Sequence, residues 1–437
     1  MSTNQNLKPI TANYGEKGLE IGNCSLVDLA KEYKTPLYII DEVTLRSIAK
    51  EYQNAYKNYE NIKMCYASKA LCNLAITKIL DEEGFGFDAV SQGELFTIKT
   101  ANVDMAKVVF NGNNKSEKEL EYALEIGVGR ISVDNFYEAS LLNKIASDKN
   151  KIVDILLRIT PGIECHTHDY IQTGQIDSKF GFDLSQLDDI TNLIKTKYKN
   201  LNIKGLHAHI GSQIFEIKSF EDEIKILIKE LKRINEKFSL SANELNIGGG
   251  LGVKYTETDV PPSVDDMAKS IINALKSSLE DASWLTLYIE PGRSIISTSG
   301  VTLYTIGSSK QVPNGKKYVA IDGGMADNPR PSLYQAKYSA EVVKPSSNEK
   351  EIVTIVGRYC ESGDVLIENI ELPKLSAGDI LCVFNTGAYN YSMASNYNRV
   401  EKPAMVLVNN SQSDMIVYRE SLEDLIAKEC IPDRLRK

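Results

Sequence analysis

Hydrophobic residues repeat along this chain in two different rhythms, and the change falls near residue 294. Before it, short apolar runs alternate with stretches that carry apolar residues three and four positions apart, such as 220–238 and 264–279. The first pattern is typical of buried strands and the second of amphipathic helices. The predicted strands of this part span residues 63–68, 86–90, 108–111, 130–134, 152–159, 203–210, 244–247 and 285–290.

Strands that alternate with helices predict a parallel sheet, and eight is the number that closes a (β/α)8 barrel. We therefore expect an α/β fold with a TIM-like barrel, and the alternative is an open doubly wound sheet. A strand over residues 37–40 and a helix over 41–59, capped by Asp41 or Thr44, are predicted just before the alternation begins.

After residue 294 the pattern consists of short Val-, Ile- and Tyr-rich runs separated by Gly, Pro and Asn. Evenly spaced short strands of this kind predict an antiparallel sandwich or barrel, and hence a second, mainly antiparallel β domain. A brief helix over residues 421–428 is expected to finish the chain. The runs are residues 301–306, 318–321, 352–356, 365–370, 380–384, 404–408 and 415–418.

Composition excludes several classes of protein. The chain has 437 residues and a net charge of -9, without a Lys/Arg block that could follow a phosphate backbone, so nucleic-acid binding is not expected. Its polar beginning is no signal peptide, and no apolar run is long enough to span a bilayer. The seven cysteines are scattered and form no Cys-x-x-Cys pair, which indicates reduced thiols in a cytoplasm and neither a disulfide framework nor a zinc site.

Functional side chains fall at the carboxyl ends of the predicted barrel strands. The active site of a (β/α)8 barrel lies at that end, so this register is the strongest indication of a site that the residues give. The residues concerned are Lys69, Asp88, Asn111, Asp134, Arg158, His209, Gly248, Gly249, Gly250 and Glu290.

Lys69 closes the first barrel strand in the run Tyr66-Ala67-Ser68-Lys69-Ala70. Because side chains in a strand alternate, Cys65, Ala67 and Lys69 are expected to point the same way, so two small residues lie beneath one long amine. A lysine at the end of a buried strand can lose part of its charge and become a nucleophile, whereas the simpler interpretation is a surface lysine.

Glycines 248–250, with Leu251 and Gly252, follow the seventh strand. Backbone N–H groups of such a turn can close on a phosphate, and barrels often hold phosphate after strands seven and eight. An ordinary tight turn uses the same residues. The run does not match G-x-G-x-x-G followed by a ribose-binding acid, so a dinucleotide is disfavoured.

All four histidines lie between residues 166 and 209, and His207 and His209 are two apart in the predicted sixth strand. Metal ligation is possible in principle, but no nearby carboxylates or thiols complete a ligand set, and no metal is expected. An imidazole plane at a barrel mouth suits a flat cofactor, while His207 can equally be a hydrogen-bonded core residue. Glu290-Pro291-Gly292-Arg293 adds an acid for a ring nitrogen and a base for an anion. Together with Lys69 these groups point to pyridoxal 5'-phosphate.

With these residues assembled, the chain resembles the fold-type III pyridoxal phosphate-dependent decarboxylases over nearly its whole length. The motifs that carry the resemblance are Tyr66-Ala67-Ser68-Lys69-Ala70, Phe87-Asp88-Ala89-Val90-Ser91-Gln92-Gly93-Glu94, His207-Ala208-His209-Ile210-Gly211-Ser212-Gln213, the glycine run, Glu290-Pro291-Gly292-Arg293, Cys360-Glu361-Ser362-Gly363-Asp364 and Gly387-Ala388-Tyr389. The resemblance implies a cofactor-binding barrel over residues 42–295, a β domain of residues 1–41 and 296–437, and a homodimer with shared active sites.

The resemblance also implies roles for individual residues. Lys69 would bind the cofactor covalently, His209 would stack on its ring, Glu290 would pair with the ring nitrogen, and Cys360 from the partner subunit would donate a proton. The network around the lysine would consist of Asp88, Glu94 and Arg158. Cofactor binding, mainly to the phosphate, would involve Ser212, Gly248, Gly249, Gly250, Pro291, Gly292, Arg293 and Tyr389, and the substrate would contact Arg293, Arg330, Tyr334, Glu361 and Tyr389.

The expected reaction is decarboxylation of meso-2,6-diaminopimelate to L-lysine and CO2, a step of lysine biosynthesis. The alternatives are a relative that acts on carboxynorspermidine, ornithine or arginine, and a catalytically silent regulatory homologue. Three positions depart from the family pattern: Tyr338 stands where many relatives carry histidine, Asn390 replaces a common glycine, and Pro329 precedes Arg330. They bear on the shape of the distal substrate pocket.

Overall fold

The computed structural model describes residues 2–163 and 178–436, and its contacts divide the chain into two compact units. The barrel unit comprises Met1–Asn6, Arg46–Lys254 and Thr258–Ser297. The sheet unit comprises Leu7–Leu45, Tyr255–Glu257 and Thr298–Lys437. The domain limits at residues 42 and 295 stay a prediction, and Cys165, His166 and His168 lie outside the described residues.

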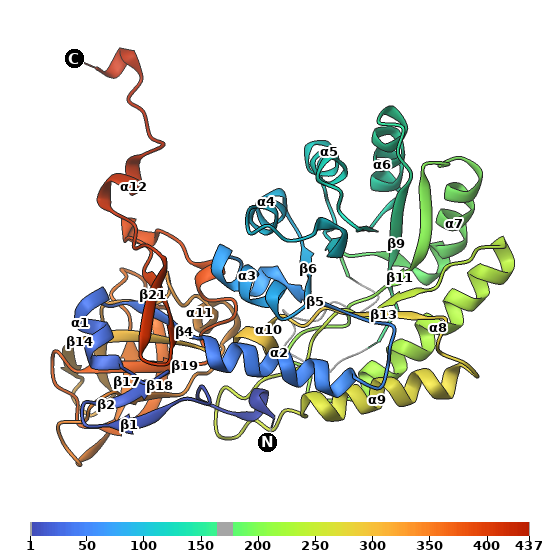
Figure 1. Ribbon diagram of the computed structural model, residues 1–437. Helices are drawn as coiled ribbons and strands as arrows, with labels where there is room; N and C mark the ends of the chain where they lie inside the picture. Colours follow the sequence, from blue (N-terminus) through green and yellow to red (C-terminus); the bar gives the residue numbers. More distant parts are fainter. Residues whose placement is uncertain (1, 164–177, 437) are drawn as a thin grey trace. The chain divides into compact units, whose positions relative to one another are not determined.

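Eight parallel strands close the barrel (Figure 1). The strand order runs from β9 through β11, β12, β13, β5, β6 and β7 to β8, and β8 pairs with β9 to complete the ring. This confirms the predicted (β/α)8 fold and excludes the open sheet. The strands are β5 (Ile62–Ala67), β6 (Gly86–Ala89), β7 (Val108–Phe110), β8 (Arg130–Val133), β9 (Val153–Thr160), β11 (Leu201–His207), β12 (Glu244–Asn246) and β13 (Thr286–Ile289), and the short β10 (Phe182–Asp183) pairs with β9 outside the ring.

Helices follow the strands and cover the outside of the barrel. The prediction of helices over 220–238 and 264–279 is confirmed by α8 (Lys218–Phe238) and α9 (Val264–Ser278), which bury an apolar stripe and expose charged residues. Side-chain caps set several starts; for example, Asp41 accepts a hydrogen bond from the Thr44 amide just before α2 (Glu42–Tyr56). The others are α3 (Leu74–Glu82), α4 (Gln92–Thr100), α5 (Glu117–Ile126), α6 (Phe136–Asp148), α7 (Leu187–Thr196) and the single turn α10 (Arg293–Ile296).

The sheet unit is mainly antiparallel, as predicted, with parallel pairs only at β4–β20 and β15–β17 among its described strands. Its large sheet contains β4 (Leu37–Asp41), β14 (Gly300–Gln311), β15 (Lys317–Ile321), β16 (Ala340–Val342), β17 (Lys350–Val356), β18 (Val365–Pro373), β19 (Ile380–Phe384), β20 (Ala404–Asn409) and β21 (Gln412–Val417). The N-terminal part adds a small sheet and a helix that the sequence pattern did not reveal: β1 (Asn13–Gly15), β2 (Gly18–Ile21), β3 (Cys24–Ser25) and α1 (Leu26–Tyr33). Two further short helices are α11 (Arg330–Tyr334) and α12 (Leu422–Ile426).

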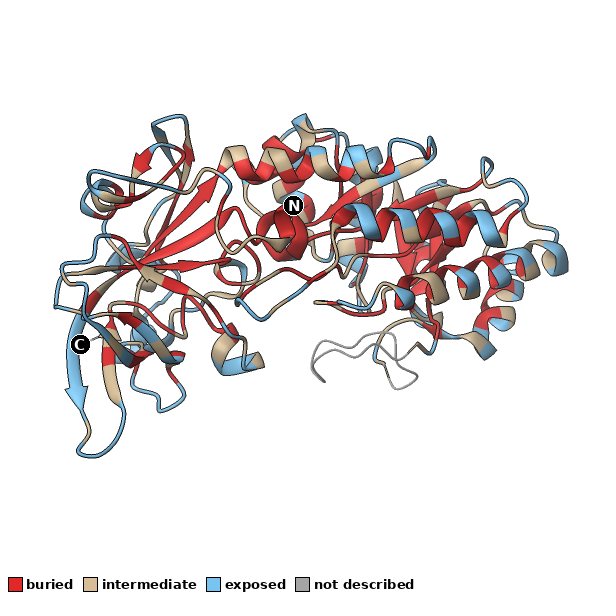
Figure 2. Cartoon of the chain, turned by 90° about the horizontal axis from the view of Figure 1, so that it is seen from below, coloured by how far each residue is buried: buried red, intermediate tan, exposed pale blue. Residues whose placement is uncertain are grey.

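Burial follows the expected division between strands and helices. Figure 2 shows most strands in buried red and most helices with one pale blue, exposed side, whereas β1 and β21 are not buried. Inside the barrel, Cys65, Val109, Leu156 and Tyr288 form one apolar cluster. The barrel interior is therefore packed, and the polar side chains near the carboxyl ends of the strands lie above this apolar core. Within residues 2–163 and 178–436, no helix combines the length and apolar character that crossing a membrane requires.

Candidate active site

Lys69 lies in a turn of 3-10 helix, Ser68–Ala70, directly after β5. The predicted strand was one residue too long, so strand alternation does not determine where Lys69 points. The small neighbours have another reason: a Cβ on Gly292 would lie 2.9 Å from the Cβ of Ala67 and 3.3 Å from that of Ala70. Larger residues at 67, 70 or 292 would separate the ends of β5 and β13, which the Ala67 amide joins by donating to the Pro291 carbonyl at 3.1 Å.

Glu290 follows β13 and is the best-connected carboxylate at this end of the barrel. Its Oε1 accepts hydrogen bonds from Asn246 Nδ2 at 2.6 Å and Asn111 Nδ2 at 3.1 Å. Burial would raise the pKa of Glu290, but His207, the Asn246 amide and the Lys69 cation together lower that pKa to about 2. Glu290 is therefore an anion at neutral pH, as a partner for a protonated ring nitrogen must be.

The pKa of Asp88, in β6, is shifted in the opposite direction from that of Glu290. Burial first, and then the charge of Glu290, raise the pKa of Asp88 to about 7, against the opposing effect of Lys69. Asn111 Nδ2 donates to Asp88 Oδ1 at 2.6 Å and to Glu290 as well, so one amide group joins the two carboxylates. Two carboxylates with such different proton affinities can hold one proton between them at neutral pH.

His207 ends β11 and is buried. Its Nδ1 lies 2.8 Å from the Ser132 hydroxyl, and its Nε2 lies 3.5 Å from Glu290 Oε2. Burial lowers the pKa of His207, so the ring is neutral. Accepting the Ser132 proton at Nδ1 leaves N–H on Nε2, which then faces the Glu290 carboxylate.

His209 lies beyond the end of β11, so the predicted strand was too long and strand alternation does not decide whether His207 and His209 share a face. The His209 ring packs on the glycine turn, where the Gly249 amide approaches His209 Nδ1 at 3.4 Å. Gly248 has a φ of 62°, and a Cβ there would lie 2.7 Å from that nitrogen. Glycine is therefore required here both for the backbone conformation and for the approach of the ring.

Arg293 begins α10 and is buried, and its Nε and Nη2 lie 3.3 and 3.0 Å from the Ser212 hydroxyl. Arg293 and Ser212, which were both predicted to bind phosphate, are thus neighbours in space although 81 positions separate them in the sequence. A guanidinium and a hydroxyl together provide donors suited to a phosphate group.

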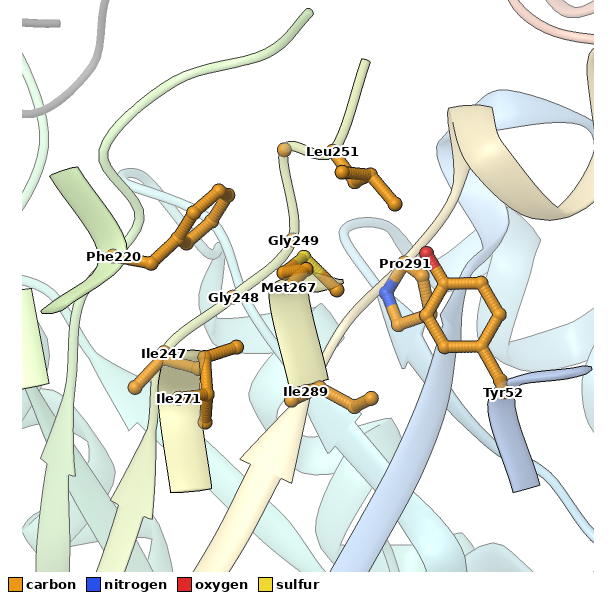
Figure 3. Close-up of a pocket in the computed structure, with 11 residues that line it drawn as sticks. Tyr52, Phe220, Ile247, Gly248, Gly249, Leu251, Met267, Ile271, Ile289 and Pro291 are labelled. Carbon is orange, nitrogen blue, oxygen red and sulfur yellow. The ribbon is translucent and has the colours of Figure 1, made fainter. Parts of the chain in front are cut away.

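A small pocket lies on the helix side of the glycine turn (Figure 3). Its side chains are almost all apolar and come from α2, α8, α9 and the ends of β12 and β13, so the pocket does not suit an anion. Arg293 and Ser212 are not among its lining residues. These are Tyr52, Phe220, Ile247, Gly248, Gly249, Gly250, Leu251, Met267, Ile271, Ile289 and Pro291.

Arg158 and Glu94 complete the polar groups predicted around the lysine. Arg158 Nη1 is 3.8 Å from Asp134 Oδ1, and its guanidinium lies over the Phe180 ring at 4.3 Å. Glu94 accepts a 2.7 Å hydrogen bond from the Val90 amide, and the Lys69 charge acts against the rise that burial causes in its pKa. Both residues belong to the barrel unit.

The remaining predicted residues belong to the sheet unit. Arg330 is buried at the start of α11, Tyr334 ends that helix, and Tyr389 has a left-handed φ of 61°. Cys360 and Glu361 are exposed, and the Cys360 amide donates to Asn398 Oδ1 at 2.8 Å. The participation of these five residues in one site with the barrel stays a prediction.

Sequence reasoning missed Asn246 and Ser132, which fix Glu290 and His207. Both are polar residues in buried strands, and Asn246 alternates with Glu244, whose carboxylate binds Arg130 at 2.6 Å near the other end of β12. Polar residues at every second position of a strand that is otherwise apolar were the available signal. Among the described residues, no group of three His, Cys, Asp or Glu side chains could hold a metal ion.

The barrel residues fit pyridoxal phosphate on four counts. Lys69 lies close enough to Asp88, Glu94 and Glu290 for its charge to oppose the rise that burial causes in their pKa values. Glu290 is an anion, the His209 ring packs on the glycine turn, and Arg293 contacts Ser212. An amine, a carboxylate, a flat ring and an anion site are the groups that hold this cofactor.

A family model described as "Pyridoxal-dependent decarboxylase, pyridoxal binding domain" matches residues 45–297. The chain belongs to the pyridoxal-dependent decarboxylases. Its similarity to particular members of the family extends beyond the barrel. The diaminopimelate decarboxylase of Synechocystis sp. is 46% identical over 99% of this chain and 95% of its own length, and that of Bacillus methanolicus is 46% identical over 96% of this chain and 99% of its own.

Solved decarboxylase structures have the same fold. The diaminopimelate decarboxylase from M. jannaschii, in co-complex with L-lysine, superposes with a TM-score of 0.92 at 35% identity and covers 99% of this chain and 100% of its own. The fold-type III decarboxylase architecture predicted from the sequence is therefore confirmed.

Proposed function

We propose that the chain decarboxylates meso-2,6-diaminopimelate to L-lysine and CO2, a step of lysine biosynthesis. The observation that carries the proposal is the ionised, amide-bound Glu290 in a barrel that also contains Lys69 and the Arg293–Ser212 pair. Relatives named diaminopimelate decarboxylase, at 46% identity over nearly the whole chain, support this substrate.

Pyridoxal 5'-phosphate, when bound, supplies an electron sink for the pair of electrons that remains when the substrate carboxylate leaves as CO2. Lys69 Nζ is the amine that binds the cofactor covalently. Glu290 holds a proton at the ring nitrogen, because the anion is stabilised by Asn246 and Asn111. His209 orients the ring, and Arg293, Ser212 and the glycine turn, with Pro291, Gly292 and Tyr389, bind the phosphate end.

The α-carbon must then receive a proton, and we assign that role to the Sγ of Cys360 of the partner subunit. Cys360 is exposed in the sheet unit, where a second copy can reach it. The enzyme is thus a homodimer with shared active sites. We also propose a cytoplasmic location, which the free thiols among the described cysteines support.

The distal half of diaminopimelate carries a second ammonium and a second carboxylate. Arg330, Tyr334 and Arg293 are proposed to bind the carboxylate, while Tyr389 and Glu361 complete the contacts, with Glu361 facing the ammonium. An enzyme for ornithine or arginine has no distal carboxylate, so a buried Arg330 would there face a cation.

The decisive experiment incubates the purified protein and pyridoxal phosphate with diaminopimelate, carboxynorspermidine, ornithine and arginine, and measures CO2 release. We expect turnover of diaminopimelate in clear preference. Preferred turnover of another substrate, or no CO2 from any of them, contradicts the proposal.

The shared site is tested by mixing two inactive variants, Lys69→Ala and Cys360→Ala. Subunit exchange creates hybrid dimers in which one of the two sites has both residues, so part of the activity should return. The control is each variant mixed with itself. No recovery after exchange has been demonstrated by mass spectrometry means that each chain works alone.

A further inference from the structure

Arg330 is a buried cation whose described neighbours are neutral. Its side chain belongs to a residue that is only 6% exposed, yet no carboxylate in residues 2–163 or 178–436 lies within 4.0 Å of the guanidinium. Two arginines of the barrel unit have a carboxylate nearby: the half-buried Arg130 has Glu244 at 2.6 Å, and the buried Arg158 has Asp134 at 3.8 Å. A buried charge without a counter-charge destabilises the folded state. We therefore expect Arg330 to bind an anion that comes from outside the chain.

Two tyrosines take the place of the missing carboxylate. The guanidinium carbon of Arg330 lies 4.8 Å from the centre of the Tyr255 ring and 5.5 Å from that of Tyr338. The two rings meet edge to face, with centroids 5.3 Å apart. Aromatic faces attract a cation without neutralising it, so Arg330 keeps its full charge beside the two rings.

A chain of hydrogen bonds fixes the second ring. Arg330 Nη1 donates to the Tyr338 hydroxyl at 2.5 Å, and that hydroxyl donates to Asn390 Oδ1 at 3.1 Å. Burial raises the pKa of Tyr338, so the phenol keeps the proton that it donates. The Asn390 side chain is fully buried, and its Nδ2 has no hydrogen-bond partner among the described residues, which leaves a second donor beside the same hydroxyl.

Tyr338 and Asn390 are two of the positions at which the sequence is expected to depart from the family pattern, where many relatives carry histidine and glycine is common. The two departures touch each other and together touch Arg330. A histidine can accept the arginine N–H without an asparagine behind it, whereas a phenol that accepts from arginine needs an acceptor for its own proton. The two substitutions therefore complement each other.

We propose that Tyr338, fixed by Asn390, is the residue pair that positions Arg330 for the distal carboxylate of the substrate in this chain. Tyr338 and Asn390 are positioning residues, since they act through the guanidinium. The proposal rests on the proposed function, in which Arg330 binds that carboxylate.

The test measures kcat and KM for diaminopimelate in the wild type and in Tyr338→Phe. Cadaverine (1,5-diaminopentane), which lacks the distal carboxylate, serves as a competitive inhibitor in the same assays. Without the Tyr338 hydroxyl, Arg330 loses one of its two phenol acceptors and keeps that of Tyr255. We expect the KM for diaminopimelate to rise about tenfold, or about 1.4 kcal/mol, while kcat and the inhibition constant of cadaverine change less than twofold. A general disturbance of the unit would change all three.

Three further variants sharpen the test. Tyr338→His should keep KM within about threefold of the wild type, because imidazole also accepts a hydrogen bond. If Tyr338→Phe does not fold, the KM of Tyr338→His is the measurement that decides. Asn390→Gly should raise KM about threefold in the wild-type background and have no effect in Tyr338→His. Tyr33→Phe removes another phenol of the sheet unit, one that lies 3.1 Å from the Ser413 hydroxyl, and should change nothing.

An unchanged KM in Tyr338→Phe, or an equal weakening of diaminopimelate and cadaverine, overturns the inference. So does a Tyr338→His enzyme whose KM rises tenfold. Failure of the proposed function looks different, because the wild-type protein would then release no CO2 from diaminopimelate at all.

Discussion

Glu290 in the barrel unit and Arg330 in the sheet unit are each only 6% exposed, yet their surroundings are built differently. The carboxylate receives two amide hydrogens on one oxygen and faces His207 from the other. The guanidinium lies beside two aromatic rings and forms hydrogen bonds with both tyrosines. In both cases neutral groups hold the charge in place without cancelling it.

The comparison separates functional charges from structural ones. Lys115 and Glu138 form a buried ion pair at 2.7 Å, with side chains 1% and 2% exposed, and Lys115 also donates to the carbonyls of Gly112 and Ser132. That pair is satisfied within the chain. Glu290 and Arg330 are held by polar and aromatic groups that leave charge for a partner, as expected of residues that bind a cofactor and a substrate.

The largest effect is expected from Lys69→Ala, which removes the amine of the barrel site. Activity should fall by at least about 10³-fold, the scale on which a group acting at the reacting atoms contributes. Borohydride reduction of the wild type should fix the cofactor to one tryptic peptide, the one that contains Lys69. Lys63→Ala, which changes an exposed lysine of the same strand, is the control and should label normally; label on any other lysine refutes the assignment.

Glu290→Gln should be next in size. The amide keeps the shape of the side chain and can still accept from Asn246, but it has no charge with which to hold a proton on the ring nitrogen. We expect kcat to fall about 10²-fold, on the scale of losing one preorganised electrostatic contact, and the visible absorbance of the bound cofactor to shift. A kcat within a factor of five of the wild type would show that the charge of Glu290 is not needed.

Sequence patterns predicted the barrel well because each of its strands and helices is a local feature. The amphipathic stretch at 264–279 needed no knowledge of its neighbours to be recognised as α9. The residues at strand ends were predicted by the same logic. What could not be predicted were the contacts between distant residues, such as Ser132 with His207, 75 positions apart, because a serine inside a strand carries no sign of its partner.

The sheet unit was harder to predict for the same physical reason. Tyr255 packs against Arg330 and Tyr338 across more than seventy positions of sequence, and it lies in a segment that follows the glycine turn. Nothing local distinguishes it from a loop tyrosine. Tyr338 and Asn390 were noticed only as departures from a family pattern, and their contact explains why they occur together.

Arg330→Ala removes the buried charge of the sheet unit, which was compared above with Glu290. Breaking a buried charged contact costs about 2–5 kcal/mol. The catalytic efficiency on diaminopimelate should therefore fall about thirtyfold or more, at 1.4 kcal/mol per tenfold. Arg330→Lys, the matched control for charge, should recover only part of this because an ammonium cannot reproduce a planar fork of donors. Unchanged turnover of diaminopimelate in Arg330→Ala would rule out this substrate contact.

The smallest effect concerns stability and comes from Asp88, the carboxylate that Asn111 joins to Glu290. An unfolded aspartate titrates near pH 3.9, whereas burial, with the charge of Glu290, raises the pKa of folded Asp88 to about 7. Between these values the folded state binds the extra proton, so this contribution to the free energy of unfolding is full below about pH 4 and is lost as pH rises through 7. The lowered pKa of Glu290 acts only as pH falls toward 2 and does not enter a range of pH 5–8.

Asp88→Asn in the cofactor-free protein isolates this contribution. Neutral His207 and His209 give the opposite slope, since their unfolded forms are protonated below about pH 6.5, but they do so in both proteins and cancel in the difference. Relative to the wild type, Asp88→Asn should gain about 2 kcal/mol in the free energy of unfolding between pH 5 and pH 8, measured by urea denaturation followed in the barrel unit. Equal slopes in the two proteins would mean that Asp88 is already ionised at pH 5, and the contrast between the two carboxylates joined by Asn111 would not hold.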